Sequence, residues 1–386
     1  MIEKRIAYAV EVAFIVMFMT AIWLPNIDSI FGIAPEWAAT EEKRQLQKLP
    51  PLRADWQSIV AFQRQFMKYF VDNFGFRGLL IRWNTIFKLD VLKVKQFPKV
   101  LVGEEGWLYL IKDDEGNNAL DYYRNVSLFA DEEDIARWAS PILQLDSYCE
   151  RRGIRFLLVF VPMKPRIYPE YIPSSYRPVR SESRLDQMRD YLSRKTKVRF
   201  IDLGESLIAA KPVRNVYYRL DVHWNLFGSY CGYRAIAEKL QETLPGFRFI
   251  PESSYTFKEV PTAEGDLVTM LGVKGRYRDV AYLAEPLFVP KARRVVPSYT
   301  FKGSRFTDCY ETGDTALPRL VVFHDSFFNN CKFYFAEGAS RMTCYQSYGR
   351  IDREAIEREK PDAVILQIAE SFLLKSPAFC TFIEGH

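Results

Sequence analysis

Three short runs of almost purely apolar residues constrain the fold of this chain more than any other feature. They are 155–161 (RFLLVFV), 319–323 (RLVVF) and 363–368 (AVILQI). A strand that is buried on both faces of a sheet reads as such a continuous run, whereas a strand with one wet face alternates apolar and polar residues. The runs therefore predict parallel strands that are covered on both sides.

Helical patterns separate these runs along the chain. The helix expected over 131–152 starts at an Asp and has Gly153 just past its end, as capped helices do. Further helices are expected at 181–195, 225–244 and 352–360, and further strands at 198–203 and 342–345. The alternation predicts an α/β fold in which an open parallel sheet carries helices on both faces. The Pro-, Gly- and Arg-rich stretch 245–318 is expected to be an excursion that covers or shapes the site.

The N-terminus reads as a membrane anchor. Residues 6–24 are 19 residues with one charge, Glu11, and they follow Lys4 and Arg5. A helix of that length spans about 28 Å, close to the thickness of the hydrocarbon core. The flanking positive charges favour a cytoplasmic tail at 1–5 and an extracytoplasmic remainder. A signal peptide is the competing interpretation, but no small-residue cleavage site precedes Pro25. A buried helix of a soluble protein is the third, and Glu11 favours it.

Residues 25–130 are expected to connect this anchor to an α/β domain over 131–386. The connection should contain a tether at 34–52, helices ending near residue 73 and covering 78–92, and a hairpin whose turn lies at 104–106. The net charge of +5, from 53 basic and 48 acidic residues, does not point to nucleic acid but suits an anionic partner.

Cysteine usage excludes two kinds of site. The six cysteines include no C-x-x-C pair, which rules out a zinc ribbon and a thioredoxin-type motif. An exported chain permits disulfides, most readily among the four C-terminal cysteines, and buried free thiols are the equally open alternative.

Two loops carry the candidate chemistry. One is 217–225 (YYRLDVHWN), just before a helix, and the other is 321–327 (VVFHDSF), where a buried strand runs into Ser326. In open α/β sheets, reactive groups gather at the carboxyl ends of the strands. A serine needs a base to become a nucleophile, and the base needs a partner that orients it. Asp221 and His223, at i and i+2 of an extended segment, supply both, so Ser326 is predicted as nucleophile, His223 as base and Asp221 as orienting carboxylate.

Other interpretations of these residues stay open at this point. Ser326 could be a helix N-cap, and Asp221 could cap the helix that follows it. Asp221 and His223 could ligate a metal with carboxylates completing the site. His324 competes with His223 for the role of base, although supporting the loop is the commoner role at such a position. The prediction adopted is a site without metal or cofactor.

These motifs resemble the SGNH-hydrolase-like domain of the alginate O-acetyltransferase family, AlgJ and AlgX. The resemblance rests on D-x-H-W before a helix, a later strand ending in D-S-F, and five further segments in the family's order between about residues 70 and 370. Those segments are 73–77 (NFGFR), 102–109 (VGEEGWLY), 161–170 (VPMKPRIYPE), 265–267 (GDL) and 361–367 (PDAVILQ). His324 departs from the family, whose members usually have Gly there.

The resemblance implies an SGNH-like catalytic domain in which the triad follows the permuted order Asp, His, Ser. It implies an AlgJ-type, single-pass protein of the bacterial inner membrane with a periplasmic catalytic domain. The implied partners are a membrane-bound O-acyltransferase that supplies acetyl groups, an exopolysaccharide acceptor and other secretion proteins, but no nucleic acid.

The expected reaction is acetyl transfer to a polysaccharide through acetyl-Ser326. An acetylesterase with the same triad and a non-catalytic polysaccharide-binding or assembly subunit are the alternatives. Aromatic side chains that could pack on sugar rings, and cations that could meet a uronate, are Trp224, Tyr168, Tyr348, Lys164, Arg166 and Arg350.

Overall fold

The computed structural model describes residues 2–33, 46–51, 55–113, 115–377 and 380–383. Within it, the chain forms two compact units. The first comprises residues 1–95 with 268–276, and the second comprises 96–267 with 277–386. Most of the tether predicted at 34–52 lies outside the described residues.

The first unit is helical. α1 (Ile2–Phe31) contains a segment, Arg5–Phe31, that is long and apolar enough to cross a membrane and is not buried in the structure. It ends seven residues beyond the predicted anchor, which ended at Leu24. α2 (Trp56–Asp72) and α3 (Arg77–Asp90) follow, close to the predicted bounds, and Phe76 between them adopts a left-handed conformation with φ 55°. The Asp28 carboxylate accepts a hydrogen bond from the Phe76 N–H at 2.6 Å, which ties the end of α1 to this corner.

The second unit is built on a seven-stranded sheet with the order β4-β3-β12-β9-β10-β8-β7. Its strands are β3 (Arg155–Val161), β4 (Phe200–Asp202), β7 (Arg293–Val295), β8 (Thr307–Glu311), β9 (Arg319–His324), β10 (Arg341–Gln346) and β12 (Ala363–Ala369). The first five strands in the spatial order are parallel, as predicted, and the three apolar runs form its centre. β12 comes last of these in the chain but is inserted between β3 and β9. The carboxyl ends of these three strands therefore meet at one edge.

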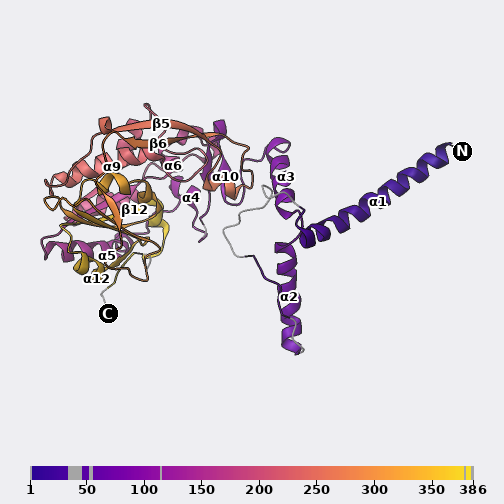
Figure 1. The fold of residues 1–386 in the computed structure, drawn as a ribbon, viewed down its shortest axis with the longest axis horizontal. Coiled ribbons are helices and arrows are strands. Elements are labelled where there is room, and N and C mark those ends of the chain that lie inside the picture. The colour runs from indigo at the N-terminus through magenta and orange to yellow at the C-terminus, as the bar shows by residue number, and fades with distance from the viewer. Residues whose placement is uncertain (1, 34–45, 52–54, 114, 378–379, 384–386) are drawn as a thin grey trace. The chain divides into compact units, whose positions relative to one another are not determined.

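Helices cover both faces of this sheet, which confirms the predicted α/β fold (Figure 1). One core lies between the sheet and α8 (Gly204–Ala210), α9 (Leu226–Gln241) and α11 (Lys332–Ala336). The other lies between the sheet and α5 (Glu132–Glu150), α7 (Arg184–Lys195) and α12 (Arg353–Glu359). Alternate residues of each strand point into opposite cores: Leu157 and Val159 into the first, and Leu158 and Phe160 into the second.

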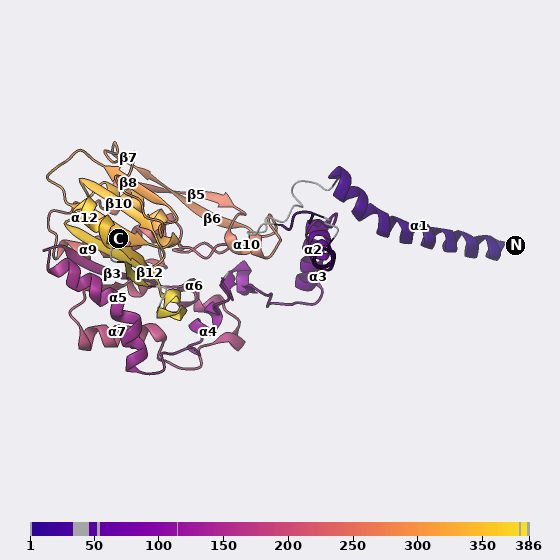
Figure 2. The ribbon, with the colours of Figure 1, turned by 90° about the horizontal axis from the view of Figure 1, so that it is seen from below.

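The excursion makes the sheet mixed rather than wholly parallel. β8 pairs antiparallel with β10, and β7 pairs antiparallel with β8. The remainder forms the hairpin of β5 (Tyr255–Thr262) and β6 (Asp279–Pro286), a long ribbon apart from the main sheet (Figure 2). The runs in this stretch alternate in polarity, as antiparallel strands with one wet face do, so they lacked the signature of the central strands.

Smaller elements complete the second unit. The predicted hairpin is present as β1 (Val100–Val102) and β2 (Leu108–Leu110), and its Leu101 and Tyr109 side chains belong to the first core. Short helices are α4 (Ala119–Tyr123), α6 (Lys164–Ile167) and α10 (Asp266–Met270), the last of which continues into the first unit, and a small sheet pairs β11 (Arg350–Asp352) with β13 (Thr381–Ile383). Single turns of 3₁₀ helix are η2 (Glu104–Gly106), η3 (Pro169–Tyr171), η4 (Ser174–Tyr176), η5 (Glu252–Ser254), η6 (Ser326–Asn330) and η7 (Glu370–Leu374).

All six cysteines are buried free thiols, so the structure contains none of the disulfides that the sequence permitted.

Candidate active site

Ser326 stands at the carboxyl end of β9, as the sequence predicted. The strand ends at His324, Asp325 follows, and Ser326 begins η6. The helix cap is Asp325, whose Oδ1 accepts a hydrogen bond from the Phe327 N–H at 2.9 Å. Because Asp325 takes the capping role, the Ser326 hydroxyl is not the N-cap and is available for other chemistry.

Asp325 also joins the Ser326 loop to β12. Its Oδ1 accepts a second hydrogen bond from Gln367 Nε2 at 3.0 Å, and its Oδ2 accepts one from the Ala369 N–H at 2.5 Å. Burial raises the pKa of this fully buried carboxyl, and the three hydrogen bonds oppose that rise. Three bonds from two elements fix the backbone that presents Ser326.

The second loop is closed at its base before it reaches the triad residues. Tyr217 and Trp224 form an antiparallel bridge, and the Asn225 N–H donates to the Val216 carbonyl at 3.0 Å. Asn225 caps α9 by accepting from the Gly228 N–H, so Asp221 is not the cap of that helix. The Trp224 indole donates to the Phe327 carbonyl at 2.9 Å and thus joins this loop to the Ser326 loop.

Asp221, His223 and Ser326 form a continuous hydrogen-bonded chain. Asp221 Oδ1 lies 2.7 Å from His223 Nδ1, and His223 Nε2 lies 2.7 Å from Ser326 Oγ. Asp221 also accepts from the backbone N–H of His223 at 3.0 Å and, through Oδ2, from that of Asp266 at 2.8 Å. The three side chains that the sequence predicted as nucleophile, base and orienting carboxylate therefore lie within hydrogen-bonding distance of one another.

The surroundings favour an ionised Asp221 and a basic His223. Burial opposes ionisation of Asp221, but the hydrogen bond and charge of His223 and the two N–H donors outweigh it, so the pKa of Asp221 lies below its ordinary value. Burial likewise disfavours the imidazolium of His223, yet Asp221 outweighs it and raises the pKa of His223. His223 therefore holds a proton from Ser326 more readily than a free imidazole would.

Lys164 binds the backbone of the 217–225 loop rather than facing a substrate. Its Nζ donates to the carbonyls of Tyr218 at 3.1 Å, Arg219 at 3.0 Å and Asp221 at 2.6 Å. The side chain is only 3% exposed, and burial lowers the pKa of the Lys164 ammonium to about 7. Three donors to three carbonyls of one turn hold the backbone of Asp221 in place.

His324 is not placed to act as the base. It is fully buried, and its Nδ1 lies 2.6 Å from the Asp325 carbonyl. Burial lowers the pKa of His324 to about 3, so the ring is neutral. Its bond to Asp325 makes it a support of the Ser326 loop.

Three side chains lie close enough together to suggest a metal site, but the one histidine among them has no free ring nitrogen. One ligand atom from each of Asp221, His223 and Asp266 can be chosen within 4.8 Å of the others. Both nitrogens of His223 are engaged, by Asp221 and by Ser326. In this arrangement the imidazole is committed to the serine rather than to a cation.

Several residues predicted to contact sugar are instead structural. Trp224 is fully buried, and Tyr168 is 2% exposed and stacks on Trp107, so neither offers a ring face to a ligand. Arg166 is held by Asp202 at 2.7 Å and Glu370 at 3.1 Å. The assignments of the buried Trp224, Tyr168 and Lys164 are corrected, because the sequence does not reveal which side chains the core takes up. Arg166 keeps 30% of its side chain exposed and stays a prediction.

Tyr348 and Arg350 remain predictions. Tyr348 is half-buried beyond the end of β10 and adopts φ 53°, and its N–H donates to the His324 carbonyl at 3.2 Å. Arg350 is exposed. Both follow the strand next to β9 and so lie at the edge of the sheet that carries Ser326.

Four supporting residues were given no role from the sequence, although Asp266 and Gln367 lie in the quoted segments 265–267 and 361–367. Asp279 accepts from the N–H groups of Arg219 and Leu220, and Asn330 donates to the Trp224 carbonyl at 3.2 Å. The Asp266 N–H donates to Asp221, and Gln367 donates to Asp325. The segment 265–267 did carry a signal, since a Cβ on Gly265 would lie 2.3 Å from the Leu220 carbonyl oxygen, and only glycine permits that approach.

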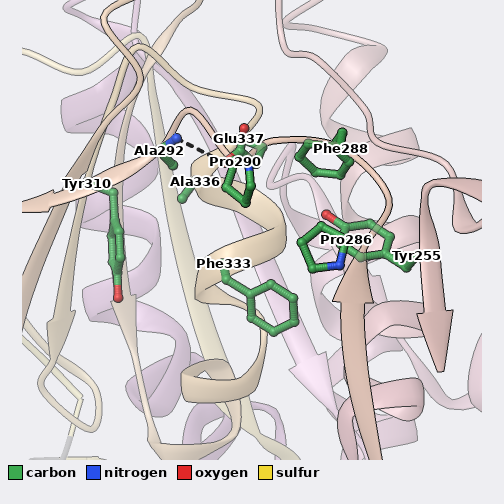
Figure 3. Close-up of a pocket in the computed structure, with 9 residues that line it drawn as sticks. All are labelled: Tyr255, Pro286, Phe288, Pro290, Ala292, Tyr310, Phe333, Ala336 and Glu337. Carbon is green, nitrogen blue, oxygen red and sulfur yellow. Dashed lines mark hydrogen bonds between the residues drawn. The ribbon is translucent and has the colours of Figure 1, made fainter. Parts of the chain in front are cut away.

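A small apolar pocket of about 100 Å³ lies away from the triad, between β6, β8 and α11 (Figure 3). Its lining includes Tyr255, Tyr310 and Phe333. Glu337 is turned to the backbone N–H groups of Lys291 and Ala292. The carboxylate is therefore occupied, and the pocket offers no acid–base pair comparable to that of the triad.

A comparison with known protein families shows which family has this sequence pattern. The family described as SGNH hydrolase-like domain, acetyltransferase AlgX, matches residues 100–300. The chain belongs to this family. The match includes Asp221 and His223 and ends before Ser326. The predicted family and the predicted enzyme class, an O-acetyltransferase, are confirmed.

Individual relatives agree with this assignment. The chain is 25% identical over 299 residues to the probable alginate O-acetylase AlgJ of Pseudomonas aeruginosa, covering 72% of this chain and 71% of that protein. Among solved structures, Bacillus cereus PatB1 with a sulfonyl adduct has a TM-score of 0.54 at 14% identity and covers 73% of this chain and 98% of that one. A DHHW family protein from Eubacterium siraeum has a TM-score of 0.52 at 16% identity, with 74% and 100% covered. These two structures share the fold.

Proposed function

We propose that this chain is an extracytoplasmic polysaccharide O-acetyltransferase that passes an acetyl group through Ser326. The observation that supports it most strongly is the continuous hydrogen-bonded chain from Asp221 through His223 to Ser326, with both links at 2.7 Å. A hydroxyl that is hydrogen-bonded to an oriented imidazole is an activated nucleophile.

The first half-reaction loads the enzyme. His223 Nε2 takes the proton of Ser326 Oγ as that oxygen attacks the carbonyl carbon of an acetyl ester. The Ser326 N–H, which makes no hydrogen bond within the described residues, donates to the oxyanion that forms. The imidazolium then gives its proton to the departing alcohol or acyl carrier, and acetyl-Ser326 remains.

The second half-reaction uses the same groups in reverse. A sugar hydroxyl enters where the first leaving group left, and His223 takes its proton as the oxygen attacks the acetyl carbon. The bond between that carbon and Ser326 Oγ breaks, and the imidazolium returns the proton to Oγ. Asp221 stays ionised and stabilises the imidazolium in both halves.

The acceptor is an alginate-like exopolysaccharide in this proposal. Support comes from the names of the relatives, which are probable alginate O-acetylases in two Pseudomonas species, P. aeruginosa and P. syringae.

α1 supports the proposed location and partner. The apolar segment Arg5–Phe31 is a candidate single-pass anchor, and Lys4 and Arg5 at its start favour a cytoplasmic N-terminus. The second unit then lies in the periplasm. An acetyl donor has to reach it there, so we propose a membrane-bound O-acyltransferase as supplier, with other secretion proteins nearby.

The test is acetyl transfer from a small acetyl ester to an alginate oligosaccharide. The full chain in detergent should acetylate the oligosaccharide, and Ser326→Ala should not. Ser147→Ala, at an exposed serine of α5, is the matched control and should behave as the unsubstituted protein. Release of acetate that added oligosaccharide does not divert would show an esterase. Equal acetylation by Ser326→Ala would refute the mechanism.

A further inference from the structure

A second hollow, much larger than the apolar pocket, opens at the carboxyl edge of the sheet. It has a volume of about 700 Å³, within the range of small-molecule sites. Three stretches and one further residue line it: the end of α4, residues 163–170 after β3, residues 177–186, and Glu370 after β12. We refer to it as the β3–β12 groove.

This groove is beside the triad in the order of the sheet. β3, β12 and β9 are neighbours, and Met163, Glu370 and Ser326 follow their carboxyl ends. Adjacent strands are about 4.8 Å apart, so the end of β3 and the end of β9 are separated by about 10 Å. Glu370 also follows Ala369, whose N–H holds Asp325 at 2.5 Å. The triad residues do not line the groove, and a ligand of several sugar units is long enough to span the two strand spacings to Ser326.

The wall formed by residues 177–181 is fixed to α4. The Val179 N–H donates to the Arg124 carbonyl at 2.9 Å, and Asn125 Nδ2 donates to the Arg180 carbonyl at 2.8 Å. Tyr123 is half-buried and lines the groove with one ring. The groove is thus bounded by backbone that is already ordered before any ligand arrives.

The acidic side chains of the groove are already occupied. Glu370 binds Arg166 at 3.1 Å, and Glu170 pairs with Lys211 at 2.7 Å. Asp186 forms a capping box with Ser183. Asp186 also lies 3.7 Å from Arg189, so each of these carboxylates has a cation beside it that weakens its repulsion of an anion.

One basic side chain has no such partner. Arg177 lines the groove, its side chain is exposed, and it makes no ion pair or side-chain hydrogen bond with the described residues. A guanidinium presents a planar fork that matches a carboxylate. The groove therefore combines an aromatic ring, hydroxyl and amide groups and one uncompensated cation.

We propose that the β3–β12 groove is an acceptor subsite that binds a sugar unit bearing a carboxylate, with Arg177 recognising that carboxylate. The inference rests on the proposed function and deepens it, because it selects acidic over neutral glycans. The bound unit is not the one that reacts but a neighbour of it along the polymer. Specificity then comes from a site about two strand spacings away from Ser326.

The experiment measures binding directly, so that it does not depend on catalysis. The full chain in detergent is titrated calorimetrically with a uronic acid oligosaccharide and with the same oligosaccharide after its carboxyl groups are reduced to alcohols. The unsubstituted protein should bind the acidic form about tenfold more tightly, the scale of one charge-assisted contact at a partly exposed site. Arg177→Gln should lose that preference.

Arg151→Gln is the control, at an exposed arginine that precedes β3 and so lies at the opposite edge of the sheet. It should keep the tenfold preference. Equal affinity of the unsubstituted protein for the two oligosaccharides would overturn the proposed subsite. A preference that survives Arg177→Gln would overturn it as well. If either result is accompanied by acetyl transfer to the glycan, the proposed function stands. Selective binding without any acetyl transfer would contradict the proposed function but not the proposed subsite.

Discussion

His223 Nε2 lies 2.7 Å from Ser326 Oγ, although 103 residues separate the two in the chain. The sequence neighbours of both residues maintain this contact. Trp224, next to His223, donates its indole N–H to the carbonyl of Phe327, next to Ser326. The His223 and Phe327 rings also pack with their centroids 4.9 Å apart. The loops are therefore joined by the neighbours of His223 and Ser326.

The first prediction concerns the orientation of His223. Asp221→Asn keeps the size of the side chain but removes the charge, and the amide can drive the imidazole into the wrong tautomer. The rate of acetyl-enzyme formation should fall by about 10³- to 10⁴-fold, as for equivalent changes in other triads. Single-turnover acetylation with a small ester measures it. A loss of less than about tenfold would mean that Asp221 does not orient the base.

The second prediction concerns pH. His223 accepts a proton only when neutral, so acetyl-enzyme formation should rise with pH and reach its midpoint above the ordinary pKa of 6.5, because Asp221 raises the pKa of His223. In Asp221→Asn that interaction is lost while burial remains, and burial lowers the pKa, so the residual activity should titrate at lower pH. Rate profiles of both proteins between about pH 5 and 9 test this. An identical midpoint in the two proteins would contradict it.

The third prediction concerns Lys164, which sequence reasoning had assigned to substrate. Lys164→Met leaves three carbonyl oxygens without their donor, so the free energy of unfolding should fall by about 2–4 kcal/mol. The Asp221 backbone also loses its support, so kcat should fall while KM for the acceptor changes little. Denaturant unfolding and steady-state kinetics measure the two effects.

Lys239→Met provides the comparison for that change. Lys239 pairs with Glu242 on the surface of α9 at 2.9 Å, and its side chain is 36% exposed. Its loss should cost less than about 1 kcal/mol. If Lys164→Met instead raised KM and left kcat and stability unchanged, Lys164 would be a substrate contact after all.

The fourth prediction concerns Gly265. A methyl group there would meet the Leu220 carbonyl oxygen at 2.3 Å, so Gly265→Ala should push the Asp221 segment away and lower kcat by at least about tenfold. At Gly246 the nearest atom to an added Cβ is 4.0 Å away, so Gly246→Ala should leave kcat unchanged. Similar kinetics for the two variants would show that the approach of Gly265 to Leu220 does not position the triad.

The sequence was informative wherever one local pattern determines the structure. The apolar runs predicted β3, β9 and β12, since a strand buried on both faces has little choice of composition. The D-x-H and D-S-F spacings brought the three triad residues into consideration, because both loops end at the same edge of a parallel sheet. Asp131 and Gly153 marked the limits of α5 in the same way.

Long-range pairing limited what could be predicted. β8 joins the main sheet only by pairing with β10, and nothing local in 307–311 indicates that partner. Trp224 and Lys164 looked like ligand contacts because their burial depends on Phe327 and on the 218–221 turn, which come from distant parts of the chain. Arg177 was not singled out, since a cation without a partner is recognised only when its neighbours are known.

The most direct test of the central claim is intact mass spectrometry of the full chain after exposure to a small acetyl ester. The account predicts an adduct of about 42 Da, the mass of an acetyl group that replaces a hydrogen, which is absent in Ser326→Ala and is discharged by added acceptor oligosaccharide. The same adduct on Ser326→Ala, or acetyl transfer to the oligosaccharide by that variant, would contradict acetyl transfer through Ser326.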